Sequence, residues 1–324
     1  MLEHGGNLST AVTRYGIPLE NWLDLSTGIN RNHYPIPEIP PSLWHQLPND
    51  EDGLVNIAAN YYGCRSLLPT SGSQAALQAL PTLRSLGTVA MLKPMYQEHA
   101  HAWQRCGHQV LSFSDLNDEP ILNQADVVLL CNPNNPTGKQ FSAQDLLQLH
   151  AKLARRGGWL VVDEAFMDAT PEHSIAQHSH LDGLFVLRSL GKFFGLAGAR
   201  VGFMLAADEQ LKKLQESLGP WTLTGPSRFI AKQALQDTAW QENTRITLKS
   251  SSKRLETLLS QYGLKPTAGT ALFQYVMTAQ AQVLQERLAA KGIWVRLFKE
   301  QPALRFGLPH DSGWQLLEDA LKSL

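Results

Sequence analysis

The sequence predicts an α/β protein in which a large domain, built on a mostly parallel sheet, is followed by a smaller α+β domain. Two observations carry this prediction. After about residue 48, helical patterns alternate with short apolar runs, which are typical of strands buried on both faces of a parallel sheet. From about Pro226 the order changes to a long helix, then short strands and further helices, which indicates a second layer. The chain has 324 residues, 43% of them hydrophobic, so it can bury a substantial core.

The first elements follow an extended connection. Four prolines, Pro35, Pro37, Pro40 and Pro41, make residues 30–48 a loop, because proline and the residue before it disfavour helix. The elements expected next are a helix that opens at Thr70–Ser73 and runs through Leu86, a strand at Val89–Leu92, a helix at Glu98–Cys106 and a strand at Val127–Cys131.

The rest of the large domain repeats this alternation. A helix at Ala143–Arg156 is ended by Gly157, and the strand Trp159–Asp163 carries a carboxylate at its carboxyl end. A further strand, Leu184–Leu187, leads into a loop with a lysine. In an open α/β sheet, ligand-binding groups are expected at the carboxyl ends of the strands.

The smaller domain is predicted from its own succession of elements. These are the long helix after Pro226, a strand at Ala271–Val276, a helix to Lys291, short strands at Ile293–Leu297 and Ala303–Phe306, and a terminal helix. We therefore expect an N-terminal segment (1–30) that packs with the small domain, a large domain (31–222) and a small domain (223–324).

Charge and composition exclude several classes of protein. Lys and Arg number 28 against 29 Asp and Glu, so the formal charge of −1 predicts no nucleic-acid partner. The start Met1–Gly6 lacks a basic segment followed by an apolar core, and no later stretch is apolar for long enough to span a bilayer. We expect a cytoplasmic protein with no membrane partner.

The cysteines and histidines do not predict a metal site. Cys64, Cys106 and Cys131 lack a Cys-x-x-Cys spacing, so we expect reduced, buried thiols. His99 and His101 are two residues apart on a predicted helix and do not share a face. We expect both to be solvated and the protein to hold no metal.

The run from Leu187 to Gly202 contains the most informative chemistry. Lys192 stands among small residues, three after Ser189 and eight before Arg200, and Arg200 lies in a Gly-x-Arg-x-Gly step. The lysine offers an amine for an aldehyde, and the other two offer a hydroxyl and a guanidinium for a phosphate, which together suit pyridoxal phosphate (PLP). Ser-x-x-Lys also occurs in β-lactamases, but their Ser-Asp-Asn and Lys-Thr-Gly motifs are absent from the sequence.

Four other motifs support this cofactor, although each has an ordinary structural alternative. Asp163 at a strand end can pair with the protonated pyridine nitrogen, or it can be a simple cap. Asn135, in a turn after a buried strand, can hydrogen-bond the 3′-oxygen. Ser71-Gly72-Ser73-Gln74 opens a helix, whose start favours phosphate. Tyr96, just past a strand, can stack on the ring.

These motifs resemble, in their order along the chain, the PLP-dependent aspartate aminotransferase superfamily of fold type I. The matching set is Ser-Gly-Ser-Gln, Pro-x-Tyr, Asn-Pro-x-Asn-Pro-Thr-Gly, Asp-Glu-Ala-Phe, Ser-x-x-Lys and Gly-x-Arg-x-Gly. The resemblance covers the chain from about residue 25 to its end. It implies that the large domain is an α/β/α sandwich and that the protein is a homodimer.

Within that superfamily the chain resembles most closely the threonine-phosphate decarboxylases of cobalamin biosynthesis, and next the histidinol-phosphate aminotransferases. The features that carry this are His4-Gly5-Gly6-Asn7, the stretch from Asp24 to Asn30, Asp163-Glu164-Ala165-Phe166, and the Leu187–Phe193 run. The resemblance implies that Lys192 and Asp163 are catalytic. The implied cofactor-binding residues are Ser71, Gly72, Ser73, Gln74, Tyr96, Asn135, Asp163, Phe166, Ser189, Lys192 and Arg200. The implied substrate-binding residues are His4, Gly5, Gly28, Asn135, Arg296 and Arg305.

The sequence also departs from these relatives. Many of them have a Tyr-Pro-Asp step whose tyrosine reaches the cofactor phosphate of the neighbouring subunit, whereas this chain has Leu47-Pro48-Asn49. The related aminotransferases usually have tyrosine at the position of Phe166, and a phenylalanine cannot hydrogen-bond the 3′-oxygen. Gly28 replaces an asparagine seen in some decarboxylases, so only its backbone can bind.

The expected function is the PLP-dependent decarboxylation of L-threonine O-3-phosphate. The expected partner is thus a small phosphorylated amino acid, which two arginines could bind through its phosphate and carboxylate. One alternative is a histidinol-phosphate-type aminotransferase. A PLP-binding transcription regulator would need a DNA-binding domain, for which a signature beginning near residue 25 leaves no room.

Overall fold

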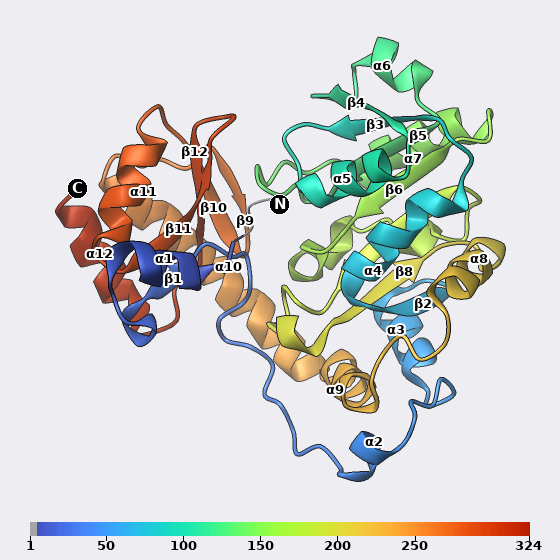
Figure 1. Ribbon diagram of the computed structural model, residues 1–324, viewed down its shortest axis with the longest axis horizontal. Helices are drawn as coiled ribbons and strands as arrows, with labels where there is room; N and C mark the ends of the chain where they lie inside the picture. Colours follow the sequence, from blue (N-terminus) through green and yellow to red (C-terminus); the bar gives the residue numbers. More distant parts are fainter. Residues whose placement is uncertain (1–4) are drawn as a thin grey trace. The chain divides into compact units, whose positions relative to one another are not determined.

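The computed structural model describes residues 5–324, which form two compact units (Figure 1). The central unit comprises Tyr34–Asn135 and Gln140–Glu242. The terminal unit comprises the chain up to His33, Pro136–Lys139 and Asn243–Leu324. Within residues 5–324 no helix has both the length and the apolar composition needed to cross a membrane.

A seven-stranded sheet forms the middle of the central unit. Its strands lie in the order β2 (Leu67–Ser71), β8 (Val201–Leu205), β7 (Leu184–Ser189), β6 (Trp159–Asp163), β5 (Val127–Cys131), β3 (Thr88–Leu92) and β4 (Gln109–Phe113). β7, β6, β5, β3 and β4 run parallel, whereas β8 is antiparallel to both β2 and β7. The predicted mostly parallel sheet is confirmed; β2, β4 and β8 are additional to the prediction.

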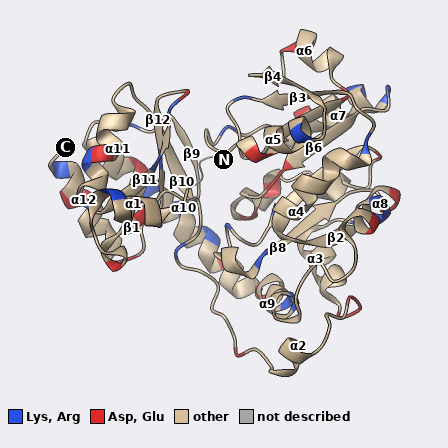
Figure 2. Ribbon diagram, in the orientation of Figure 1, with Lys and Arg blue, Asp and Glu red and all other residues tan. Residues whose placement is uncertain are grey.

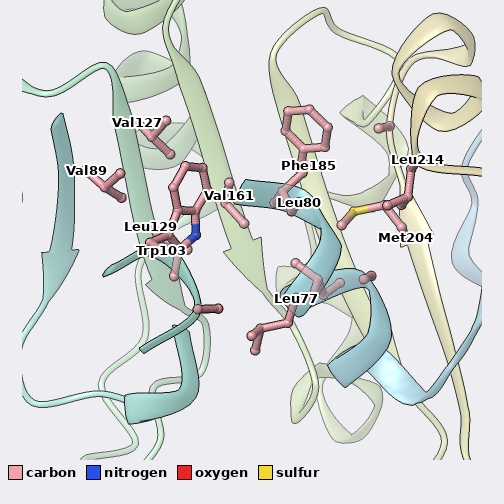
Figure 3. Close-up of a cluster of buried hydrophobic side chains, with 14 of the residues drawn as sticks. Leu77, Leu80, Val89, Trp103, Val127, Leu129, Val161, Phe185, Met204 and Leu214 are labelled. Carbon is pink, nitrogen blue, oxygen red and sulfur yellow. The ribbon is translucent and has the colours of Figure 1, made fainter. Parts of the chain in front are cut away.

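Helices pack on both faces of this sheet. α4 (Gly72–Ala79), α5 (Gln97–Arg105) and α8 (Asp208–Leu218) share a core with one face. Figure 3 shows part of that core: Leu77, Leu80, Val89, Trp103, Val127, Leu129, Val161, Phe185, Met204 and Leu214. α3 (Leu54–Tyr62) lies on the other face, because Tyr62 contacts Phe203, which alternates along β8 with the core residue Met204.

The remaining helices of the central unit are shorter or peripheral. α7 (Ala143–Ala154) packs against β6, and α9 (Gly225–Gln236) packs against α3 and β8. The short α-helices are α2 (Ser42–His45) and α6 (Glu119–Gln124). The 3-10 helices are η2 (Leu80–Leu83), η3 (Met167–Ala169), η4 (Pro171–His173), η5 (Ala176–His178) and η6 (Ala197–Ala199).

Two of the predicted helices are wrong in their extent. The helix expected to run through Leu86 ends at Ala79 and gives way to η2, because Pro81 lacks an N–H and its ring clashes with the preceding turn. The long helix expected after Pro226 is two helices, α9 and α10 (Thr238–Gln261). Asp237 separates them: its side chain accepts a hydrogen bond from the Trp240 N–H at 2.9 Å and so caps the start of α10.

The division between the units falls one helix later than the expected division after residue 222. α9 belongs to the central unit, where the buried Arg228 donates to Asp50 at 2.8 Å and to Asp52 at 2.6 Å. Lys232, also on α9, lies 3.0 Å from Asp52. These ion pairs join α9 to the connection before α3, so the unit ends at Glu242.

The terminal unit is built on a five-stranded sheet. Its order is β1 (Leu23–Leu25), β11 (Ile293–Phe298), β12 (Ala303–Gly307), β10 (Phe273–Met277) and β9 (Ala268–Thr270), in which only the β1–β11 pair is parallel. Its helices are α1 (Leu8–Tyr15), η1 (Leu19–Asn21), α10, α11 (Ala281–Ala289) and α12 (Gly313–Lys322). The predicted strands near Ile293–Leu297 and Ala303–Phe306 are confirmed.

The charged residues of several surface helices are of mixed sign. Figure 2 shows acidic and basic residues side by side on α8, α11 and α12 rather than gathered by sign. On α8, Lys213 lies 2.8 Å from Glu209, and on α12, Lys322 lies 3.1 Å from Glu318. Such exposed pairs contribute little to stability and mark solvated helix faces.

Candidate active site

The pairing of β2, β8 and β7 collects the groups expected to bind a phosphate. Ser71 pairs with Val201 and Ser189 pairs with Gly202, so both serines lie beside the first residues of β8. Arg200 immediately precedes that strand and has a left-handed backbone conformation, with φ of 52°. Because β8 is antiparallel to β2 and β7, Ser71 and Ser189 both lie at the end of the sheet where Arg200 precedes β8, although Ser71 is far from Arg200 in the sequence.

The start of α4 completes this anion-type site. Gly72 has φ of 67°, and a Cβ placed on it would lie 2.5 Å from Nη2 of Arg200, so the guanidinium lies directly over this glycine. A Cβ on Gly202 would lie 2.2 Å from the backbone nitrogen of Ser73. Both positions therefore require glycine. Since the N–H groups and dipole of a helix start favour an anion, this cradle of helix start, guanidinium and hydroxyls fits a phosphate.

Lys192 lies in a tight loop that follows β7. Its carbonyl accepts from the Gly195 N–H at 3.2 Å, and Ser189 Oγ accepts from the Gly191 N–H at 3.2 Å. The side chain is half-buried, with Nζ 5.5 Å from the centre of the Phe166 ring. The next residue along, Phe193, is fully buried. The loop therefore holds the lysine amine at one place beside an apolar ring.

Two phenylalanines of this loop pack in an aromatic cluster around Trp240. Phe193 and Phe194 each lie 5.6 Å from the ring of Trp240 at the start of α10, and Phe194 stacks on it. Tyr34 lies 5.2 Å from the same ring, and its N–H donates to the Phe194 carbonyl at 2.8 Å. Burial, and then the charge of Asp237, raise the pKa of Tyr34.

Asp163 is a buried carboxylate with two defined partners. It is 6% exposed at the end of β6; Oδ1 accepts from the Ala165 N–H at 3.0 Å, and Oδ2 lies 2.9 Å from Nε2 of His99. The prediction that His99 is solvated is wrong, because α5 turns His99 inward together with Ala102 and Trp103. His99 stands three residues before Ala102 and four before Trp103, and this helical spacing could have predicted that it lies on the buried face of α5. His101, on the opposite side, is exposed as expected.

Tyr96 and Asn135 converge on the end of β5. The buried Cys131 thiol accepts hydrogen bonds from the backbone N–H groups of both residues, although burial and the charge of Asp163 hold the pKa of the thiol well above its usual range. Tyr96 Oη donates to Gln74 Oε1 at 3.4 Å. Burial, then Glu98 and Asp163, raise the pKa of the tyrosine to about 12, so its hydroxyl is neutral.

The turn that carries Asn135 is held by hydrogen bonds at both ends. The Asn132 side chain donates to the Phe141 carbonyl at 3.1 Å and accepts from the Phe141 N–H at 2.9 Å. Asn134 Nδ2 donates to the Pro94 carbonyl at 2.9 Å. Because Pro94 is two residues before Tyr96, this bond links the loops after β3 and β5.

A buried ion cluster beneath the site was missed by the sequence analysis. Arg188 lies 2.6 Å from Glu164 and 2.5 Å from Asp168, and all three are at most 2% exposed. Glu164 follows Asp163 and Arg188 precedes Ser189, so the cluster ties together the ends of β6 and β7. Burial raises the pKa of Glu164. Burial alone would lower the pKa of Arg188, but the carboxylates of Asp168 and Glu164 outweigh it, so the pKa of Arg188 is raised.

The terminal unit holds a second group of predicted residues. Arg296 and Arg305 are directly opposite each other on β11 and β12 and therefore share a face of the sheet. Arg305, 7% exposed, donates to the Ser26 carbonyl at 2.7 Å. Gly5 approaches the same carbonyl so closely that a Cβ would lie 2.3 Å from its oxygen.

These contacts place two guanidinium groups on one face of the terminal unit's sheet. Burial first, and then the charge of Arg296, lower the pKa of Arg305 to about 10. Like charges placed opposite each other are unfavourable unless an anion binds between them. Gly28 is buried two residues beyond Ser26. His4, the remaining predicted residue of this group, lies outside the described residues.

The three cysteines are free thiols, as expected. Cys131 is buried, whereas Cys64 and Cys106 are only partly buried, so the expectation of full burial is wrong for these two. Burial raises the pKa of the Cys64 thiol to about 11.

The comparisons with known proteins agree with this fold, which is that of the fold-type-I aminotransferases. A family model for aminotransferase class I and II matches residues 51–312. The structure of histidinol-phosphate aminotransferase from Sinorhizobium meliloti, in complex with pyridoxal-5′-phosphate, superposes with a TM-score of 0.82, at 19% identity, over 99% of this chain and 96% of that one.

Two curated relatives match nearly the whole chain. The chain is 51% identical to a threonine-phosphate decarboxylase of Pseudomonas aeruginosa, over 99% of its own length and 97% of that protein's. It is 39% identical to a threonine-phosphate decarboxylase of a Sinorhizobium species, over 98% and 97% of the two lengths. The chain belongs to the aminotransferase class I and II family.

Proposed function

We propose that this protein is a PLP-dependent carboxy-lyase that converts L-threonine O-3-phosphate to (R)-1-aminopropan-2-yl phosphate and CO2, a step of cobalamin biosynthesis. The observation that carries the proposal is the paired arginine site on β11 and β12, in a chain whose central unit has a PLP-type site. The 51% identity to a threonine-phosphate decarboxylase over almost the whole chain supports the same reaction.

The residues of the central unit fit PLP. The cradle of Gly72, Ser189 and Arg200 suits its phosphate, and the buried Asp163 carboxylate suits a protonated pyridine nitrogen. When bound, PLP withdraws electrons from the substrate Cα and so weakens the bonds to it. Lys192, beside the ring of Phe166, is the amine that would bond to the aldehyde.

The chain's own groups then have separate tasks. Asp163 keeps the pyridine nitrogen protonated, and His99 orients Asp163 through the bond to Oδ2. With the cofactor bound, Lys192 would be the acid that returns a proton to the substrate Cα after the loss of CO2. Phe166 has no hydroxyl to offer, so Asn135 is the side chain of this pair that would bind the 3′-oxygen.

The arginines are proposed to decide which bond breaks. Only a bond perpendicular to the cofactor ring overlaps its π system as it breaks. An aminotransferase clamps the substrate carboxylate near the ring plane and leaves Cα–H perpendicular. Anchoring of the phosphate by Arg296 and Arg305, with His4, Gly5 and the Gly28 backbone, would instead turn the carboxylate out of that plane.

We propose that the protein acts in the cytoplasm as a homodimer.

A product analysis tests this function. Purified protein with PLP and O-phosphothreonine should release one CO2 per substrate consumed, without a 2-oxo acid, and its cofactor should remain PLP. Accumulation of pyridoxamine phosphate with a matching keto product, and no CO2, would instead support the alternative, a histidinol-phosphate-type aminotransferase.

A further inference from the structure

One cluster in the central unit joins Asp163 and His99, which the proposed decarboxylation uses, to Cys131, which it does not use. Nε2 of His99, Sγ of Cys131 and a carboxylate oxygen of Asp163 all lie within 4.8 Å of one another. The three residues come from α5 and from the ends of the adjacent strands β5 and β6, and are 1%, 3% and 6% exposed. We propose that, without PLP, this cluster binds one borderline-soft divalent cation, Zn²⁺ being the natural candidate, in competition with the cofactor.

The chemistry of the three donors favours such an ion. Imidazole nitrogen, thiolate sulfur and carboxylate oxygen are the ligands that zinc takes in proteins, at about 2.0 to 2.3 Å. Tetrahedral bonds of those lengths place the donor atoms about 3.3 to 3.7 Å apart. The hydrogen-bonded His99 and Asp163 atoms, at 2.9 Å, would have to separate slightly, and the sulfur would have to approach.

The surroundings of the sulfur act in both directions: burial and the charge of Asp163 hold the pKa of the Cys131 thiol well above its usual range, so the thiolate needs the charge of the cation, whereas two backbone groups favour it. The Cys131 sulfur receives backbone N–H groups from Tyr96 and Asn135. Hydrogen bonds of this kind support metal-bound thiolates and tune the metal. The carboxylate is similarly oriented, because Oδ1 of Asp163 accepts from the Ala165 N–H at 3.0 Å, which leaves the Oδ2 side directed at His99. Two of the three ligands are thus held in place by the backbone.

Binding must release one proton. The Cys131 thiol loses its proton to solvent, and His99 becomes the tautomer that carries its hydrogen on Nδ1, so that Nε2 can bind the ion. Three protein ligands leave a fourth tetrahedral position for water. The Asp163 oxygen that binds the ion cannot at the same time pair with a pyridine nitrogen, so metal and PLP exclude each other.

Cadmium provides a direct probe of this site. Full-length protein stripped of PLP is titrated with Cd²⁺, and the thiolate-to-cadmium charge-transfer band in the ultraviolet is recorded. We expect the band to saturate at one Cd²⁺ per chain, and Zn²⁺ to displace it. Cys131→Ser should abolish the band, and His99→Gln should weaken binding at least tenfold. Cys106→Ser, which alters a thiol outside the cluster, is the matched control and should keep the band.

The outcomes separate this site from the proposed reaction. A missing band in the wild-type protein, or an undiminished one in Cys131→Ser, would overturn the proposal. If Cys131→Ser loses its far-ultraviolet circular dichroism, His99→Gln decides in its place. We further expect PLP-loaded protein to show no band, and equimolar Zn²⁺ to slow recovery of the visible cofactor absorbance. This last arm rests on the proposed cofactor site, whereas the cadmium band does not depend on any activity.

Discussion

Replacing Arg305 by methionine should separate anion binding from stability. The pKa of Arg305 falls from its ordinary value to about 10, so carrying the charge in the unliganded fold costs about 3 kcal/mol. Arg305→Met removes that cost together with the hydrogen bond to the Ser26 carbonyl, which contributes about 1.5 to 3 kcal/mol. We therefore expect the free energy of unfolding without ligand to change by no more than about 1.5 kcal/mol.

The effect on the substrate should be large. Loss of one guanidinium from a desolvated site costs about 2 to 5 kcal/mol, which corresponds to at least a thirtyfold loss in kcat/KM for O-phosphothreonine. The visible absorbance of bound PLP should stay near that of the wild-type protein. Arg296→Met should act in the same direction. Arg287→Met, which removes an exposed guanidinium that donates to the Ser323 carbonyl at 2.9 Å, is the control and should leave kcat/KM unchanged.

The pH dependence has a defined sign. Between pH 10 and the ordinary pKa of arginine, the unfolded chain binds more protons at this group than the folded protein, so the contribution of Arg305 to the free energy of unfolding rises with pH there. The destabilising cost is fully present below pH 10. Phosphate affinity should fall as pH rises through about 10. Urea unfolding across that pH range checks the rise in the free energy of unfolding, and substrate titration checks the fall in phosphate affinity. Loss of stability in Arg305→Met with an unchanged KM would refute the binding role.

Three further substitutions test other parts of the site. Lys192→Ala should abolish turnover and the visible absorbance of the bound cofactor, and a fully active variant would disprove the cofactor assignment. Asp163→Asn removes a charge at nearly constant shape, so kcat should fall by orders of magnitude while the melting temperature holds; retained activity would make Asp163 structural. Glu164→Gln disturbs the buried cluster with Arg188 and should lower the free energy of unfolding by about 1 to 3 kcal/mol in urea. Glu209→Gln, on the surface, should change it by less than about 0.5 kcal/mol.

The sequence predicts the central strands of the sheet better than β2, β4 and β8. β5 is an uninterrupted apolar run, β6 is apolar up to Asp163, and β7 is apolar up to Arg188, so the predicted ligand groups stand at or after the ends of apolar runs. β2 contains Pro69 and β4 is only partly buried, so neither has that pattern. The antiparallel course of β8 is set by pairing with strands remote in sequence, and local periodicity does not encode it.

The partners of the buried charged residues are a second feature that could not be predicted from the sequence. Arg188 and Glu164 stand within apolar stretches and are separated by 24 residues, so their pairing follows only from the adjacency of β6 and β7. His99 was judged only against His101, two residues away. Its spacing to Ala102 and Trp103 puts it on the buried face, and only the packing of α5 on the sheet brings it to Asp163.

The two buried arginines of this chain show how a structural charge differs from a binding one. Arg188 has carboxylates at 2.6 and 2.5 Å, and they outweigh its burial, so its pKa rises and its charge is neutralised by the protein itself. Arg305 is buried to a similar degree, but its pKa falls, because burial and the charge of Arg296 outweigh the opposing effect of the Asp24 carboxylate. Two opposed guanidinium groups repel each other, and Asp24 offsets this only in part, so a bound anion would stabilise the pair further. A phosphate with two negative charges does so, which is why the β11–β12 pair points to the substrate rather than to the stability of the unit.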